Sequence, residues 1–183
     1  MKRIVYSLTL CVMFLAQAQA QVQQNVGVGY FGNTVTYPGL VLEYGLEKMF
    51  TAQASLPLRL DVGFYHHKRY NTGVFADVNL GFRRYYASGL FLEESIGVGW
   101  MSTFVASDEV FSINDAGELE EASRYASTDV MPSITLGIGY DLTRKSAAKH
   151  LIWLRPKIFW QFPHKTTSFY SVALQVGYTY HLK

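Results

Sequence analysis

The sequence predicts an all-β protein, a single eight-stranded antiparallel up-and-down transmembrane β-barrel. Three observations carry this prediction. An apolar leader opens the chain, the remainder alternates between apolar and small or polar residues in about eight segments, and aromatic residues gather near the segment ends. Successive side chains of a strand point to opposite faces, so each segment has one apolar face and one polar face.

The leader reads as a secretory signal peptide over residues 1–20. Lys2 and Arg3 precede an apolar run over residues 4–16, and residues 18–20 form an A-x-A cleavage site. Residues 21–183 then form the outer-membrane β-barrel domain. Lipid attachment at Cys11 is disfavoured because Leu10 stands where lipoprotein processing prefers a small residue. Cys11 is the single cysteine, so the mature domain has no disulfide.

Composition excludes several other classes. The chain carries 16 basic and 14 acidic side chains, and loss of Lys2 and Arg3 with the signal leaves the two signs balanced. We therefore expect no nucleic-acid partner. No stretch after residue 20 is long and apolar enough for a membrane helix. The length fits one domain.

Eight strands are expected in chain order. They cover residues 25–30, 40–47, 56–65, 74–83, 90–100, 130–140, 152–162 and 168–183. In the first four, the apolar face carries Val26, Val28, Tyr30, Leu40, Leu42, Tyr44, Leu46, Leu56, Leu58, Leu60, Val62, Phe64, Val74, Ala76, Val78, Leu80 and Phe82. The positions between them hold glycine, aromatic or charged residues.

The last four strands repeat this alternation. Glu94 is an exception in the fifth strand, because it interrupts the apolar face close to one end. The sixth and seventh strands each accept one proline on the apolar face, Pro132 and Pro156. The eighth is the clearest, since every second residue from Tyr170 to Leu182 is apolar or aromatic.

The connections alternate in length. Bacterial barrels keep both termini in the periplasm, with short periplasmic turns and longer outer loops. The outer loops are then 31–38, 66–72, 102–124 and 163–167, and the periplasmic turns are 48–54, 86–89 and 142–149. The longest loop, 102–124, is acidic. We interpret it as solvated, and any extracellular ligand is expected there.

The inward positions carry charges of both signs. These residues are Glu43, Glu47, Arg59, Asp61, Asp77, Arg83, Glu93, Arg155 and Lys157. Eight strands enclose a space just wide enough for side chains to fill. We therefore expect a lumen plugged by paired charges, with inward glycines such as Gly97 and Gly137 leaving room for larger side chains.

A soluble eight-stranded barrel of lipocalin type is the main alternative fold. It would reverse the pattern, with apolar residues inside and polar residues outside. Burial of so many charges inside a soluble barrel is costly, which favours the membrane interpretation.

From about Val26 onward, the chain resembles the small eight-stranded outer-membrane barrels of Gram-negative bacteria. The resemblance rests on strand number, alternation and the C-terminal strand. That group includes the OmpA transmembrane domain, the OmpX-like adhesion barrels and the lipid A enzymes PagP and PagL. The resemblance implies localisation in the cell outer membrane, contact with outer-membrane lipid and lipopolysaccharide, and recognition by the barrel assembly machinery. Such barrels typically end in Phe, whereas this chain ends Tyr180-His181-Leu182-Lys183.

Enzymatic chemistry is not expected. The PagL-like signature is a His followed two residues later by Ser and then Asn, and the nearest match, His164-Lys165-Thr166, lacks the Ser and the Asn. Glu94 faces outward but belongs at the opposite membrane face from His164. No nucleophile, base and acid can be assembled, so we expect no catalytic residue.

Metal and cofactor sites are not expected either. His66 and His67 point to opposite faces if strand geometry persists, so they cannot share an ion. The rim residues His67, Lys68 and Arg69 suit lipopolysaccharide phosphates better.

These observations favour a small outer-membrane barrel of structural or surface-interaction type. A lipid A-modifying enzyme or a narrow pore are the alternatives.

Overall fold

The computed structural model describes residues 22–68, 71–105, 110–113, 119–122, 126–144, 149–162 and 169–182. The expected signal peptide, Arg69 and the His164-Lys165-Thr166 segment lie outside the described residues.

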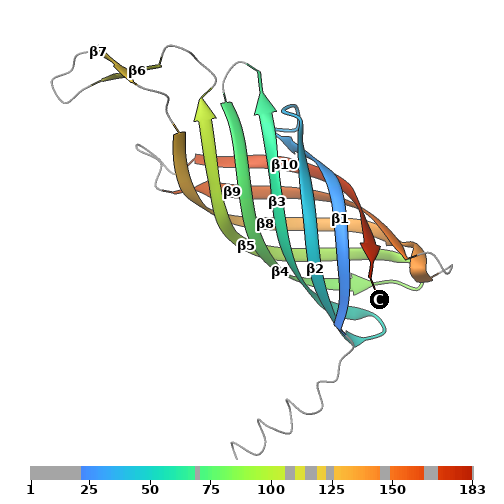
Figure 1. Ribbon diagram of the computed structural model, residues 1–183. Helices are drawn as coiled ribbons and strands as arrows, with labels where there is room; N and C mark the ends of the chain where they lie inside the picture. The colour runs from blue at the N-terminus through green and yellow to red at the C-terminus, as the bar shows by residue number, and fades with distance from the viewer. Residues whose placement is uncertain are drawn as a thin grey trace, which may run out of the picture.

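The described chain is a closed antiparallel β-barrel of eight strands, with a separate two-stranded hairpin. The barrel strands are β1 (Val22–Asn33), β2 (Gly39–Thr51), β3 (Ala54–His67), β4 (Asn71–Tyr85), β5 (Leu90–Val105), β8 (Ala126–Asp141), β9 (His150–Gln161) and β10 (Phe169–His181). Figure 1 shows them tilted across the barrel, so that those at the front cross those behind. The fold class expected from the alternation is confirmed.

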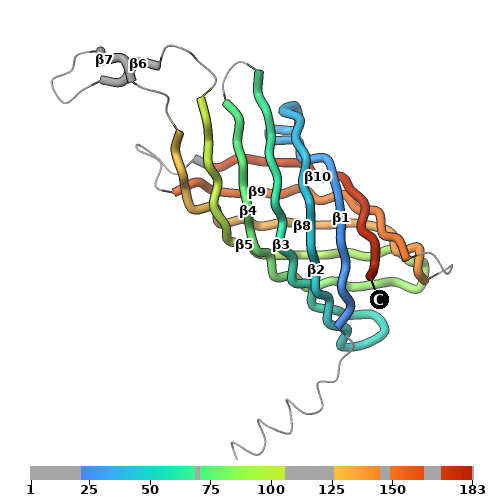
Figure 2. The backbone as a smooth tube through the Cα atoms, viewed as in Figure 1, coloured from blue at the N-terminus to red at the C-terminus, as the bar shows by residue number. Residues whose placement is uncertain are grey.

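Closure comes from pairing of the first and last strands. Around the barrel the order is β1-β10-β9-β8-β5-β4-β3-β2, and Asn25 of β1 lies opposite His181 of β10. The tube in Figure 2 shows β1 and β10 side by side. Every strand of the barrel thus has two hydrogen-bonded neighbours, which a sheet in hydrocarbon requires. We call the end where β1 begins and β10 finishes the terminal end, and the opposite end the loop end.

Two differences from expectation concern element lengths. The strands run beyond their apolar segments: β4 covers Asn71–Tyr85, where residues 74–83 were expected. Strand pairing continues past the apolar segments because polar residues can also form the backbone hydrogen bonds of a sheet where the strands leave the hydrocarbon. The Ser102 and Thr128 hydroxyls, for example, lie 3.0 Å apart across β5 and β8.

The second difference concerns residues 102–124, which were expected to form an outer loop throughout. They contain the end of β5 and a hairpin of β6 (Val110–Ile113) and β7 (Leu119–Ala122). Four paired residues on each side are too short to produce an alternation that stands out in the sequence.

The two faces of each strand differ as the alternation requires. On β8, Ile134 is 47% exposed and the adjacent Thr135 is 1% exposed. Apolar side chains such as Leu42, Val98 and Ile158 cover the outer wall. In the part of the chain that the structure describes, no helix reaches the length and apolar character needed to cross a membrane.

The turns at the terminal end are tight. The turn between β4 and β5 ends at Gly89, whose positive φ of 93° suits glycine. Its N–H donates to the Tyr86 carbonyl over 3.0 Å. After β8, a short 3₁₀ turn, η1 (Leu142–Arg144), leads toward β9.

Candidate functional site

The nine inward charges expected from the sequence are all buried in the lumen. We call this set the charge lattice: Glu43, Glu47, Arg59, Asp61, Asp77, Arg83, Glu93, Arg155 and Lys157. Strand alternation puts them on the inner wall, and the narrow barrel brings residues of non-adjacent strands together.

Two ion pairs cross the lumen. Arg155 Nη1 of β9 donates to Glu43 Oε2 of β2 over 2.5 Å. Lys157 Nζ, also on β9, donates to Asp77 Oδ2 of β4 over 2.5 Å. In both pairs two other strands lie between the partners on the shorter way around the barrel. These bonds therefore tie opposite walls together.

Glu93 is the hub of the lattice. Its Oε2 accepts from Arg83 Nη2 over 2.6 Å and from Arg83 Nε over 2.9 Å. Arg59 Nη1 donates to the other oxygen, Glu93 Oε1, and Arg155 Nη2 lies 3.6 Å from Glu93 Oε2. Arg83 also reaches Glu47 Oε2 over 2.7 Å. One carboxylate thus holds three guanidinium groups in place.

Neutral side chains complete the lattice. Trp153 Nε1 donates to Thr179 Oγ1 over 2.8 Å, and Thr179 Oγ1 donates to Glu43 Oε1 over 2.5 Å. The Arg155 guanidinium lies 4.0 Å from the Trp153 ring centroid, within cation–π range.

Asp61 and Asp77 stand directly opposite each other on β3 and β4, an arrangement that is unfavourable for two acids. The Asn79 amide offsets this by donating to both, over 3.0 Å to Asp61 and 2.8 Å to Asp77. Asp77 also forms the ion pair with Lys157, whereas the nearest cation to Asp61 is Arg59, whose Nε lies 3.7 Å from Asp61 Oδ1. Asp61 is therefore the more weakly paired of the two.

An aromatic layer fills the lumen on the loop-end side of the lattice. Phe31 lies 4.6 Å from Phe75, 6.4 Å from Phe159 and 6.3 Å from Tyr65, measured between ring centroids. These four rings come from β1, β4, β9 and β3, and all are buried. Apolar side chains therefore cover the charges on that side.

The terminal end of the lumen is covered by Arg144. Its guanidinium lies 4.2 Å from the Tyr85 ring, and its Nη2 donates to the Ala52 carbonyl over 2.8 Å. Arg144 Nε is also 3.4 Å from Asp141 Oδ2. This arm connects the β8–β9 turn to the β2–β3 turn across the opening.

Sequence reasoning missed several lumen residues. Asp129, Asp141, Trp153 and His181 are buried inside, but only His181 had been placed on an inner face. Extending the alternation by one or two residues past each apolar run would have found Asp129 and Asp141. Trp153 stands between the outward-facing Ile152 and Leu154 and follows the same rule.

The rim residues are only partly described. The His67 ring meets Tyr37 edge-on with centroids 3.9 Å apart, and Lys68 is exposed. His66 Nδ1 contacts Thr72 Oγ1 at 2.8 Å. Within the described residues, no group of three or more His, Cys, Asp or Glu side chains is arranged to hold a metal ion.

Comparison with known proteins supports the fold. No protein-family model and no curated protein matches the chain. Among solved structures, Ail, the attachment invasion locus protein of Yersinia pestis, aligns with a TM-score of 0.51 and 10% identity, over 88% of this chain and 97% of Ail. Neisserial surface protein A aligns over 88% of this chain and 95% of its own, at 8% identity and a TM-score of 0.46.

These neighbours are small outer-membrane β-barrels, the group that the sequence resembles. At 10% identity, the likeness to Ail shows the shared fold alone.

Proposed function

We propose that the protein is a small outer-membrane β-barrel of structural or surface-interaction type whose plugged lumen does not conduct ions. The proposal rests on the two ion pairs that cross the lumen, Arg155–Glu43 and Lys157–Asp77. A water-filled pore would need these bonds broken and the charges left apart.

Energetics favour a fixed lattice. Removing charges from water costs several kcal/mol per ion, and good geometry with further hydrogen bonds is needed to offset that cost. The contacts of Glu93 and Glu43 supply such geometry. The aromatic layer on one side and Arg144 on the other further restrict water.

The proposal includes location and partners. The apolar outer wall suits a bilayer, and the expected signal peptide directs the chain to the envelope of a Gram-negative bacterium. We propose that lipopolysaccharide phosphates bind His67, Lys68 and Arg69 at the loop end. The barrel assembly machinery recognises the C-terminal strand, and an extracellular partner binds within residues 102–124.

Planar-bilayer recording tests the plug. Refolded wild type should give no reproducible single-channel steps, whereas Lys157→Ala, which removes one cross-lumen bond, should give brief openings. Heat-modifiable electrophoretic mobility confirms that both proteins are folded. Large, regular steps from the wild type would overturn the proposal and favour a pore.

Two further experiments test the remaining parts. An epitope tag within residues 114–118 should be stained on intact cells, and a tag within residues 145–148 should not; the reverse pattern would invert the orientation.

We also propose that the protein is not an enzyme, so lipid A from cells that overproduce it should keep its acyl chains unchanged. Loss or gain of an acyl chain would favour the PagL-like or PagP-like alternative.

A further inference from the structure

Glu94 lies on the outer wall of the barrel, where its neighbours are apolar. It is exposed on β5, with Leu92 and Ile96 on either side, and it stands opposite Phe82 of β4 and Leu136 of β8. No hydrogen bond or ion pair joins the Glu94 carboxylate to another described side chain. A charged side chain that faces hydrocarbon is costly and usually marks a functional position.

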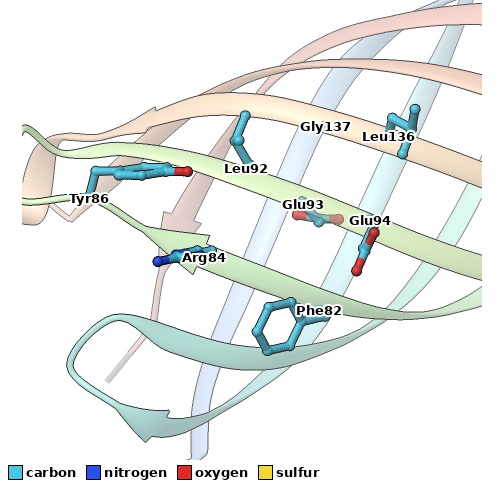
Figure 3. A pocket seen from close by; sticks show the side chains of 8 residues that line it. All are labelled: Phe82, Arg84, Tyr86, Leu92, Glu93, Glu94, Leu136 and Gly137. Carbon is cyan, nitrogen blue, oxygen red and sulfur yellow. The ribbon is translucent and has the colours of Figure 1, made fainter.

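Glu94 lies in a hollow of about 440 Å³ formed by β4, β5 and β8. Phe82, Arg84, Leu92 and Leu136 also line it. Figure 3 shows Arg84 with its nitrogen atoms turned toward Tyr86, away from Glu94. The Arg84 guanidinium lies 5.9 Å from the Tyr86 ring centroid. The two charged groups therefore stand in one hollow without pairing with each other.

The register fixes their order along the barrel. Arg84 is opposite Leu92, and Glu94 is two residues farther from the terminal end. Arg84 is therefore closer to the aqueous edge and Glu94 is deeper. A molecule in this hollow meets a cation first and a hydrogen-bond acceptor below it.

A second hollow of about 270 Å³ lies on β4 and β5, farther from the terminal end. Its lining is apolar: Val78, Leu80, Ile96, Gly97 and Val98. Ile96 is 66% exposed, so the hollow opens to the surrounding hydrocarbon. A hollow of this kind suits an acyl chain.

We propose that the two hollows bind one monoacyl glycerophospholipid from the leaflet at the terminal end. Its phosphate binds Arg84, its free glycerol hydroxyl donates a hydrogen bond to the Glu94 carboxylate, and its chain lies against Val78 and Val98. Phosphate, hydroxyl and chain follow one another in this lipid in the same order as their partners on the wall. A diacyl phosphatidylcholine has no free hydroxyl and no N–H, so it leaves Glu94 without a donor.

Native mass spectrometry of the refolded full-length barrel tests this assignment. The probes are palmitoyl-lysophosphatidylcholine and dipalmitoylphosphatidylcholine, because choline has no N–H donor and the glycerol hydroxyl becomes the sole headgroup donor. Wild type should retain one lysolipid, and Glu94→Leu should weaken retention by about tenfold, the equivalent of one charge-assisted hydrogen bond. Arg84→Leu should weaken it as well.

Two variants complete the design. Lys48→Leu removes another cation near the terminal end, on β2, and should leave retention unchanged. Val98→Phe fills the second hollow with an apolar side chain and should reduce retention of the lysolipid while the barrel stays folded.

Three results would overturn the proposal. One is equal retention by wild type and Glu94→Leu. Another is retention of the diacyl lipid with the same dependence on Glu94, because the hydroxyl would then not be recognised. The third is a strong coupling between Arg84→Leu and Glu94→Leu in unfolding experiments without lysolipid, which would mean that the two side chains pair with each other.

Discussion

Glu93 and Glu94 are adjacent and chemically identical, yet they lie on opposite walls of the barrel. Glu93 is 4% exposed and holds Arg59, Arg83 and Arg155. Glu94 faces outward in an apolar neighbourhood, and its carboxylate forms no ion pair with a described residue. The same side chain is therefore a structural hub in one position and an unpaired acid in the next. The alternation of the strand decides which role each takes.

The largest expected effect comes from removing the hub. Glu93→Leu leaves three buried guanidinium groups short of a partner, and breaking such a pair costs about 3–5 kcal/mol. Urea unfolding in phosphatidylcholine vesicles measures the loss. Glu94→Leu is the matched control and should unfold at the same urea concentration as wild type or a higher one. Equal losses at the two positions would mean that the register of β5 is wrong.

A new charge on the outer wall should have the next largest effect. Ile134 lies opposite Ile96 and Ile158, so Ile134→Arg has no acidic neighbour and should cost about 2–4 kcal/mol near the bilayer midplane. Ala126→Arg, at the loop end of the same strand, should cost at most about 1 kcal/mol. The same unfolding assay compares them, and a cost independent of depth would argue against a bilayer around this wall.

Crowding should limit substitutions on the inner wall. A Cβ placed on Gly177 would lie 2.3 Å from Cζ2 of Trp153, so Gly177→Ala should cost about 1–3 kcal/mol through overpacking. Trp153→Leu removes the clashing ring, and the double variant should lose less than the two single variants added together. Simple additivity in the urea midpoints would show that the ring does not limit this position.

The smallest effect is expected at the terminal opening. Arg144→Ala removes one hydrogen bond to Ala52 and a partly exposed ion pair to Asp141, and such contacts are each worth about 1 kcal/mol or less. Faster hydrogen exchange of the Tyr85 backbone amide should accompany this small loss of stability. Unchanged exchange would mean that Arg144 does not cover the opening.

The sequence was sufficient for the fold because one rule governs both walls. Alternation predicted that Thr135 faces inward and Ile134 outward, and both lie as expected. It could not reveal that Arg155 donates a hydrogen bond to Glu43, because those residues are 112 positions apart and meet only after closure. The β6–β7 hairpin was missed because its strands are too short for a recognisable pattern.

The candidate site divides in the same way. The lattice residues could be listed from alternation alone, whereas the central position of Glu93 depends on side-chain lengths across a narrow lumen. Glu94 was visible as a break in an apolar face. The two hollows beside it could not be predicted, because they depend on how side chains of β4, β5 and β8 pack against one another. Packing of this kind leaves no periodic trace in a sequence.

The pairing of β1 with β10 also constrains the order of events during folding. Asn25 and His181 are opposite each other although they belong to the first and the last strand of the barrel. Contacts between such distant residues form slowly because a long loop must close first. The first strand must therefore wait for the last, and a chain that stops before β10 would leave β1 and β9 with unpaired backbone groups that hydrocarbon does not tolerate. Completion of synthesis thus becomes a condition for stable insertion.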